Sequence, residues 1–277
     1  MFLIAIGLAG LLFGVGSSEV RRFENAAARD ISSRLLGVSK QVKVRIKFDP
    51  FQAIGGRLKS GTITASNFVT EGLPLFTQPE GSKRGRLDEL KISLAEFELT
   101  GLQVKKLEAR IPNCRFDFGL AQKKGQIRLT KSGIGTGSVE IDQRGLLKYI
   151  SQRHPTLKNV QLQLLSDQIQ ISGTGRFMAF EAYVQIQSRL HSPDGSTIQL
   201  VDAEVLINGE KAVPLARDAV LKVLNPVVDL NRDLKLFGAL TIDSVTVGAN
   251  SLMATGRAHI PDHPLGTWIN RIGLFFP

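Results

Sequence analysis

Apolar and polar residues alternate along most of the chain after its first 18 positions. The segment 40–48 is the clearest case, because four apolar side chains there alternate with three basic ones. The apolar residues are Val42, Val44, Ile46 and Phe48, and the basic residues are Lys43, Arg45 and Lys47. Successive side chains of an extended chain point to opposite faces. We therefore expect a half-buried strand with a basic outer row.

Several alternating runs are much longer than an average strand of about 5–6 residues. We predict strands at 57–70, 87–99, 102–117, 126–130, 160–164, 169–171, 180–187, 198–207, 234–247 and 252–260. Strands of this length need bulges and bends, and we place bends or turns at Gly61, Gly101 and Gly119. Two hairpin turns are also predicted, at 123–125 (KKG) and at 193–195 (PDG).

Three segments have a helical pattern instead. In 19–36 apolar residues recur at spacings of three and four and form one stripe, which fits packing on a sheet or, alternatively, on a bilayer surface. The stripe consists of Val20, Phe23, Ala27, Ile31 and Leu35. Asp142 is positioned to cap a short helix that ends at 154–155 (HP). A third helix is expected at 214–224, with Pro214 in its first position.

The order of these elements is helix, strands, short helix, strands, helix, strands. This is not the regular alternation of a parallel α/β sheet. We predict an α+β fold in which long, curved antiparallel sheets wrap around one long and two shorter helices. No linker rich in proline, glycine or serine divides the chain. The sequence therefore predicts a single domain at 18–260.

Both ends of the chain are apolar. Residues 1–17 contain no charged side chain, and the run at 2–15 is FLIAIGLAGLLFGV. At about 14 residues this run fits a signal peptide or a short membrane anchor better than a full span of roughly 20 residues. A start site placed too far downstream, or a buried core helix, is the alternative. The tail at 261–277 is expected either to dip into a membrane interface or to close one end of the fold.

The net charge of +10 and the pI near 9.9 indicate an acidic partner, such as nucleic acid, anionic lipid or a polyanionic glycan. Nucleic-acid binders interleave basic and aromatic residues. Here the basic residues are scattered along alternating strands, and most of the 15 phenylalanines share the apolar face. We therefore predict an anionic membrane surface and no nucleic acid, with solvated strand and loop faces as the alternative. The basic residues expected at headgroups are Lys43, Arg45, Lys47, Lys83, Arg84 and Arg86.

Catalytic and metal-binding signatures are missing from the sequence. It has no Gly-x-Ser-x-Gly, no phosphate-binding glycine loop and no His-Glu-x-x-His motif. His259 and His263 are four residues apart, but a proline between them prevents the helix that a zinc pair needs. Cys114 is the only cysteine and is expected to be a packed thiol. We predict no enzyme, no metal and no cofactor. A lipid hydrolase that pairs a serine with His154 or His191 remains an alternative.

The stretch 205–260 contains a series of short patterns in a defined order. They are LING at 206–209, VPL at 213–215, NPVVDL at 225–230, LTIDSVTV at 240–247 and ATGRA at 254–258. Nearer the amino end, GRL at 56–58 and GSVEI at 137–141 fit the same series. In this order the patterns resemble the LmeA-like phospholipid-binding family, and the resemblance covers 18–260. It implies an elongated barrel similar to tubular lipid-binding proteins, a phospholipid ligand and an exported, envelope-associated protein.

The patterns and the resemblance together predict a protein that binds or transfers lipid in the cell envelope, either periplasmic or attached to the membrane through its N-terminal apolar segment. Acyl chains would lie in an apolar groove between sheet and helices, since burial of each CH₂ contributes about 0.8 kcal/mol. The expected lining residues are Phe23, Ile31, Val44, Ile46, Phe68, Val184, Ile186, Val220 and Leu224. The alternative is a non-enzymatic, membrane-attached scaffold with a solid core.

Overall fold

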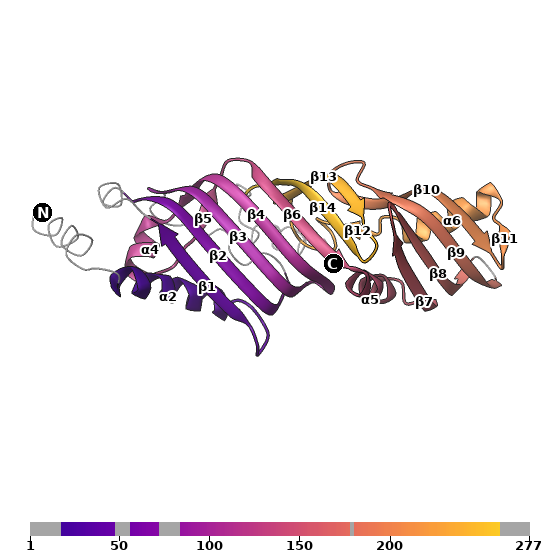
Figure 1. The fold of residues 1–277 in the computed structure, drawn as a ribbon, viewed down its shortest axis with the longest axis horizontal. Helices are drawn as coiled ribbons and strands as arrows, with labels where there is room; N and C mark the ends of the chain where they lie inside the picture. Colours follow the sequence, from indigo (N-terminus) through magenta and orange to yellow (C-terminus); the bar gives the residue numbers. More distant parts are fainter. Residues whose placement is uncertain (1–17, 48–55, 72–83, 178–179, 261–277) are drawn as a thin grey trace, which may run out of the picture. The chain divides into compact units, whose positions relative to one another are not determined.

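The computed structural model describes residues 18–47, 56–71, 84–177 and 180–260. Within them the chain is α+β, with four helices and two mostly antiparallel sheets of eight and six strands (Figure 1). The predicted α+β class and the antiparallel pairing are confirmed. The predicted barrel is wrong for these residues, because each sheet is an open series of strands that ends at two edges. The expected leader (1–17), the tail (261–277) and Lys83 lie outside the described residues.

The helices begin and end close to the predicted positions in three of four cases. They are α2 (Ser18–Ser33), α4 (Phe118–Lys124), α5 (Gln143–Arg153) and α6 (Pro214–Leu224). The side chain of Asp142 caps α5 by accepting a hydrogen bond from the Gly145 N–H at 2.6 Å. Helix α6 begins at Pro214, as expected for a residue whose missing N–H would have no partner in the first turn.

Helix α4 occupies the place of the hairpin turn predicted at 123–125. The buried side chain of Asp117 accepts a hydrogen bond from the Leu120 N–H at 2.9 Å and so begins the helix. Gly125 has a left-handed φ of 65°, and its N–H donates to the Ala121 carbonyl at the end of the helix. The turn prediction is wrong because a glycine in this conformation can end a helix as well as turn a hairpin.

The eight-stranded sheet has the order β1-β2-β3-β4-β6-β14-β13, with β5 paired to β4. Its strands are β1 (Gln41–Lys47), β2 (Arg57–Thr70), β3 (Gly85–Leu99), β4 (Leu102–Phe116), β5 (Leu129–Lys131), β6 (Gly135–Asp142), β13 (Leu240–Val247) and β14 (Ser251–Ala258). Strands β1 and β2 pair antiparallel with Val44 opposite Ile63, and both residues are buried. The strand predicted at 234–247 begins only at Leu240.

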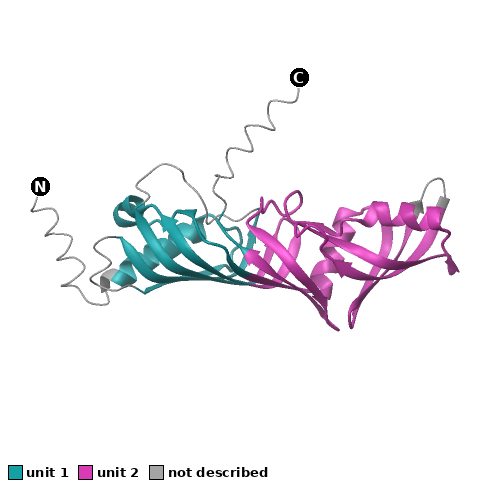
Figure 2. Cartoon of the chain, turned by 90° about the horizontal axis from the view of Figure 1, so that it is seen from above, with its two compact units in different colours: residues 1–95, 108–136, 258–277 teal, residues 96–107, 137–257 magenta. Residues whose placement is uncertain are grey.

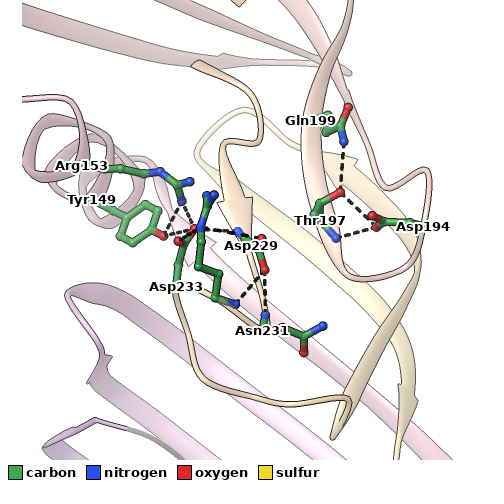
Figure 3. Close-up of polar contacts among 9 residues, drawn as sticks. Tyr149, Arg153, Asp194, Thr197, Gln199, Asp229, Asn231 and Asp233 are labelled. Atoms are coloured by element: carbon green, nitrogen blue, oxygen red, sulfur yellow. Dashed lines mark hydrogen bonds and ion pairs between the residues drawn. The ribbon is translucent and has the colours of Figure 1, made fainter. Parts of the chain in front are cut away.

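The six-stranded sheet has the order β11-β10-β9-β8-β7, with β12 paired to β10. Its strands are β7 (Leu157–Leu165), β8 (Gln168–Phe177), β9 (Phe180–His191), β10 (Thr197–Ile207), β11 (Glu210–Lys211) and β12 (Val228–Asp229). The turn predicted at 193–195 joins β9 to β10. There the Asp194 carboxylate accepts hydrogen bonds from the N–H groups of Ser196 and Thr197, both at 2.8 Å. The contact with Thr197 is drawn in Figure 3.

The long strands carry β-bulges, which the sequence analysis expected, but at acidic and amide residues. Five residues inside strands have a left-handed φ between 48° and 55°: Asn67, Glu96, Asn113, Asn159 and Asp202. Around the first three, two residues separate consecutive buried positions where strict alternation needs one. The strand register shifts near the last two. Each bulge therefore exchanges the faces on which the following side chains lie.

The chain forms two compact units (Figure 2): unit 1 comprises 1–95, 108–136 and 258–277, and unit 2 comprises 96–107 and 137–257. In unit 1, α2 packs beside β1, where the buried Glu24 accepts a hydrogen bond from the Ile46 N–H at 2.9 Å. In unit 2, the Asn225 side chain that follows α6 bonds to both backbone groups of Leu200 on β10. The single domain expected at 18–260 stays a prediction.

Candidate functional site

A small cavity of about 60 Å³ lies inside unit 2, and its lining is almost wholly apolar. Strands β3, β4, β6, β13 and β14 supply most of the lining, together with Ile198 of β10 and Val228 of β12. Leu230, Leu234 and Leu236 complete it. Ligand pockets commonly measure about 300–1,000 Å³. The cavity is therefore too small, in the conformation described, to hold a lipid tail.

The three leucines come from residues 229–238, which we call the leucine segment. After Asp229, which still pairs with Thr197 of β10, its backbone is held by turn-like backbone hydrogen bonds and by side chains. Oδ1 of Asp229 accepts hydrogen bonds from the N–H groups of Asn231 at 3.0 Å and Arg232 at 2.9 Å. The Asn231 side chain accepts one from the Gly238 N–H at 2.9 Å. Such local bonds compete with strand formation, which explains why β13 begins later than predicted.

Asp233 fastens the leucine segment to α5 (Figure 3). Its Oδ2 accepts hydrogen bonds from the Tyr149 hydroxyl at 3.2 Å and from the Asp229 N–H at 2.9 Å. Arg153 forms an ion pair with the same carboxylate and donates to the Tyr149 hydroxyl at 3.2 Å. Arg232 donates to Oδ1 of Asp233 at 3.0 Å. The side chains of Arg153 and Asp233 are only 19% and 16% exposed, so their pairing is partly shielded from water.

The protonation states around α5 suit this arrangement. Burial raises the pKa of the Tyr149 phenol, although the positive charge of Arg153 acts in the opposite direction. The hydroxyl therefore stays protonated at neutral pH and can donate to Asp233. Burial, reinforced by the charge of Arg153, lowers the pKa of His154 at the end of α5. The imidazole is therefore neutral near pH 7 and adds no second positive charge beside Arg153.

The residues predicted to line a groove are mostly core residues. Eight of the nine are buried: Ile31, Val44, Ile46, Phe68, Val184, Ile186, Val220 and Leu224. Phe23 is half-buried. None of these nine lines the cavity in unit 2, and the first five in chain order belong to unit 1. That these residues line a lipid groove stays a prediction.

The residues around the cavity were not singled out from the sequence as a set. They meet because β6 lies between β4 and β14 in the sheet order, and the leucine segment then covers that part of unit 2. Alternation shows which face a residue takes but not which strands become neighbours. The sequence did contain a pattern that could have identified them, because the short motifs at 225–230, 240–247 and 254–258 supply many of the lining residues.

The basic residues predicted to meet headgroups lie on exposed positions where the structure describes them. Lys43, Lys47, Arg84 and Arg86 are exposed, and Arg45 forms an ion pair at 2.6 Å with a glutamate of α2. Their contact with headgroups stays a prediction. None of the helices in the described segments has both the length and the apolar character required to cross a bilayer.

Cys114 lies on β4 as a buried thiol, as expected from the sequence. Burial raises its pKa to about 12, so the thiol is a weak nucleophile at neutral pH. Within the described ranges, no three or more histidine, cysteine, aspartate or glutamate side chains gather in a way that could hold a metal ion.

Comparisons with known proteins give one match. A family model described as LmeA-like phospholipid-binding matches residues 83–257, which is more than half of the chain. Comparisons with curated proteins and with solved structures found no match. All residues that line the cavity in unit 2 fall inside the matched range.

Proposed function

The chain belongs to the LmeA-like phospholipid-binding family, and from this premise we propose that it binds or transfers phospholipid, with acyl chains taken into the apolar interior of unit 2. The observation that supports this most directly is the overlap of the family match with the whole lining of the apolar cavity. The ligand of the proposal is a phospholipid or another acyl lipid, and the proposal includes no enzymatic step.

Binding of an acyl chain requires the cavity of about 60 Å³ to widen. The leucine segment is the part of the lining best suited to move, because 230–238 belongs to no helix or strand. The contacts of Asp233 with α5 hold it in place and would have to break first. Outward movement of Leu230, Leu234 and Leu236 would let hydrocarbon take their place. Each CH₂ of the lipid that becomes buried contributes about 0.8 kcal/mol, which offsets the packing that the leucines lose.

The proposal also includes a location. The protein acts in the cell envelope, periplasmic or attached to the membrane through residues 1–17, and its exposed basic residues face anionic headgroups. Each basic residue near an anionic surface adds about 1 kcal/mol of attraction. The exposure of Lys43 and Lys47 on β1 supports this part of the proposal.

A cavity-filling variant tests the acyl-chain site. Ala254 lines the cavity from β14, so Ala254→Leu places additional carbon atoms in the space that a lipid tail would enter. We expect the phospholipid that the purified protein retains after exchange with vesicles, measured by mass spectrometry, to fall several-fold. Overpacking costs about 1–3 kcal/mol, so thermal unfolding is followed in parallel.

The matched control is Ala249→Leu, at an exposed position in the turn between β13 and β14, and it is expected to retain phospholipid like the unmodified chain. The proposal is rejected if the unmodified chain reproducibly carries no phospholipid and exchanges none with vesicles.

A scaffold with a solid core is the second candidate function. The small volume of the cavity in unit 2 is the observation that favours it. Under this alternative the leucine segment stays in place, and vesicle exchange leaves the protein without lipid. The mass-spectrometric measurement therefore separates the two functions.

A further inference from the structure

Unit 1 contains a second, larger pocket of about 540 Å³ with a different chemical character. Its described lining comes from β2, β3, β4, β5 and the residues that follow β5. Four cationic side chains take part, Arg57, Arg86, Arg115 and Lys131, against the single carboxylate of Asp88. We call this the basic pocket. None of its residues belongs to the lining of the apolar cavity in unit 2.

Strand geometry brings the cations to this pocket. Arg86 is exposed between the buried Gly85 and Leu87 of β3. On β4, strict alternation from the buried Ile111 would turn Arg115 toward the core. The bulge at Asn113, with a φ of 53°, shifts the alternation by one residue. Cys114 then becomes buried and Arg115 exposed, so that Arg115 can line the pocket.

Within the part of the chain that the structure describes, the charges of the basic pocket are only partly balanced by carboxylates. Arg57 donates to Asp88 at 3.0 Å, which accounts for the one carboxylate. Among the residues that the structure describes, Arg86, Arg115 and Lys131 have no ion-pair partner. Moreover, Arg115 and Lys131 are direct register partners on β4 and β5. Like charges directly opposite each other destabilise a sheet. This arrangement has a stability cost that a bound anion would remove.

We propose that the basic pocket binds a phosphate-bearing anion, either the headgroup of a phospholipid or a soluble phosphate ester. Planar guanidinium groups donate two parallel hydrogen bonds to phosphate oxygens, and the lysine adds a point charge. A volume of about 540 Å³ lies in the range of small-molecule sites. The described lining contains no aromatic side chain on which a base could stack, which argues against single-stranded nucleic acid.

If the anion is a lipid headgroup, the inference rests on the proposed function, because it adds a second contact with the same ligand. If the anion is a soluble phosphate ester, the inference depends only on the residues of the basic pocket, all of which lie in unit 1. Of the basic residues predicted to contact headgroups, Arg86 lines the pocket. The other three cations of the lining, Arg57, Arg115 and Lys131, were not predicted from the sequence.

The test compares two charge-matched variants of the full chain. The pocket variant combines Arg86→Gln, Arg115→Gln and Lys131→Gln. The control combines Arg22→Gln, Arg29→Gln and Lys123→Gln, three exposed cations of unit 1 outside the pocket. Binding is measured to phosphatidylcholine vesicles with and without phosphatidic acid, and to glycerol 3-phosphate at constant ionic strength. We expect the pocket variant to bind the anionic probes about tenfold or more weakly than the control, because charge-assisted hydrogen bonds are lost.

A single substitution provides a check that does not depend on the triple variant. In Lys131→Glu the new carboxylate lies opposite Arg115 on the neighbouring strand. We expect the melting temperature to rise, because a like-charge pair becomes an opposite-charge pair, while binding of the anionic probes falls. A melting temperature that falls, together with unchanged binding, would contradict the inference.

The outcomes separate this inference from the proposed function. Binding to phosphatidic acid vesicles alone identifies a lipid headgroup, and binding to glycerol 3-phosphate as well identifies a soluble phosphate ester. Either result supports the inference when it depends on the pocket residues. If the pocket variant and the control bind equally, the inference is overturned, even where phospholipid is retained in unit 2. If glycerol 3-phosphate binds through the pocket and no phospholipid is retained, the inference stands and the proposed function fails.

Discussion

Asp30 and Arg128 form an ion pair between α2 and the segment before β5, in which the guanidinium is buried and the carboxylate is largely shielded from water. Nη1 and Nη2 of Arg128 donate to the two carboxylate oxygens of Asp30 at 2.5 and 2.8 Å. The side chains are 3% and 13% exposed for Arg128 and Asp30. The two residues are 98 positions apart in the chain. No periodicity in the sequence could have paired them, because each takes part in a different local pattern.

The first prediction concerns this pair. Asp30→Asn leaves the Arg128 guanidinium buried without its counter-charge, so we expect the free energy of unfolding at pH 7 to fall by about 3 kcal/mol, the lower end of the range for breaking a buried pair. Urea unfolding followed by circular dichroism measures the change. The control is Asp243→Asn, which breaks a half-exposed pair with Arg257 and is expected to cost less than about 1 kcal/mol.

The effect of Asp30→Asn depends on pH. Burial by itself raises the pKa of Asp30, but the hydrogen bonds and charge of Arg128, assisted by Arg34, more than offset it, and the pKa lies below its usual value. A lowered pKa in the folded state means that the stabilisation is complete above the unfolded pKa of about 3.9 and is lost as the pH falls through the folded value. The difference between the two proteins is therefore expected to shrink below about pH 4. An equal difference at pH 7 and pH 3 would argue against the assignment.

At the scale of elements, local sequence patterns predicted the bounds of a helix or strand correctly where they were compatible with only one structure. Strand β2 and helix α6 have the bounds that the sequence predicted, because a long alternating run, interrupted once by the bulge at Asn67, and an N-terminal proline leave few alternatives. The predictions were wrong where the same sequence pattern is compatible with two different structures. The glycine at 125 fits a hairpin turn as well as the end of a helix. In 229–238, bonds within the segment and the contacts of Asp233 with α5 accompany the turns that formed.

The end of α4 gives a second prediction. Gly125 has a left-handed φ, and a Cβ there would lie 2.6 Å from Cβ of Ala26 on α2. We expect Gly125→Ala to lower the free energy of unfolding by about 2 kcal/mol or more, since it combines backbone strain with a steric clash. Gly209→Ala is the control, because its φ is also left-handed while nothing lies within 4 Å of the added Cβ. Equal losses in the two variants would show that α2 and α4 do not pack as described.

The leucine segment gives a third prediction. Asp233→Asn removes the charge that holds Arg153 and weakens the bond from Tyr149, so the segment is expected to open more often. Hydrogen exchange at the amides of Asp229 and Gly238 should accelerate, and phospholipid uptake from vesicles should become faster. Asp218→Asn, which breaks an exposed pair with Arg217, is expected to change neither rate. Slower uptake, with faster amide exchange, would exclude the segment as the entry point.

At the scale of the whole molecule, the two units contain different kinds of pocket. Unit 2 contains a small apolar cavity between strands and the leucine segment, and unit 1 contains a pocket with four cationic side chains. The net charge of +10 indicated an acidic partner but not where it would bind. The register between β4 and β5 places Arg115 opposite Lys131. Part of the positive charge is therefore concentrated at the basic pocket.

The sequence by itself determined the α+β class, most strand and helix positions, the packed state of Cys114 and the family, because each depends on local periodicity or on a linear series of patterns. Only the tertiary structure decided that the sheets stay open, that α4 is a helix, and which residues surround the two pockets. These features depend on which strands become neighbours and on where bulges exchange the faces of a strand. Such choices are made by contacts between distant parts of the chain, for which a local pattern contains no information.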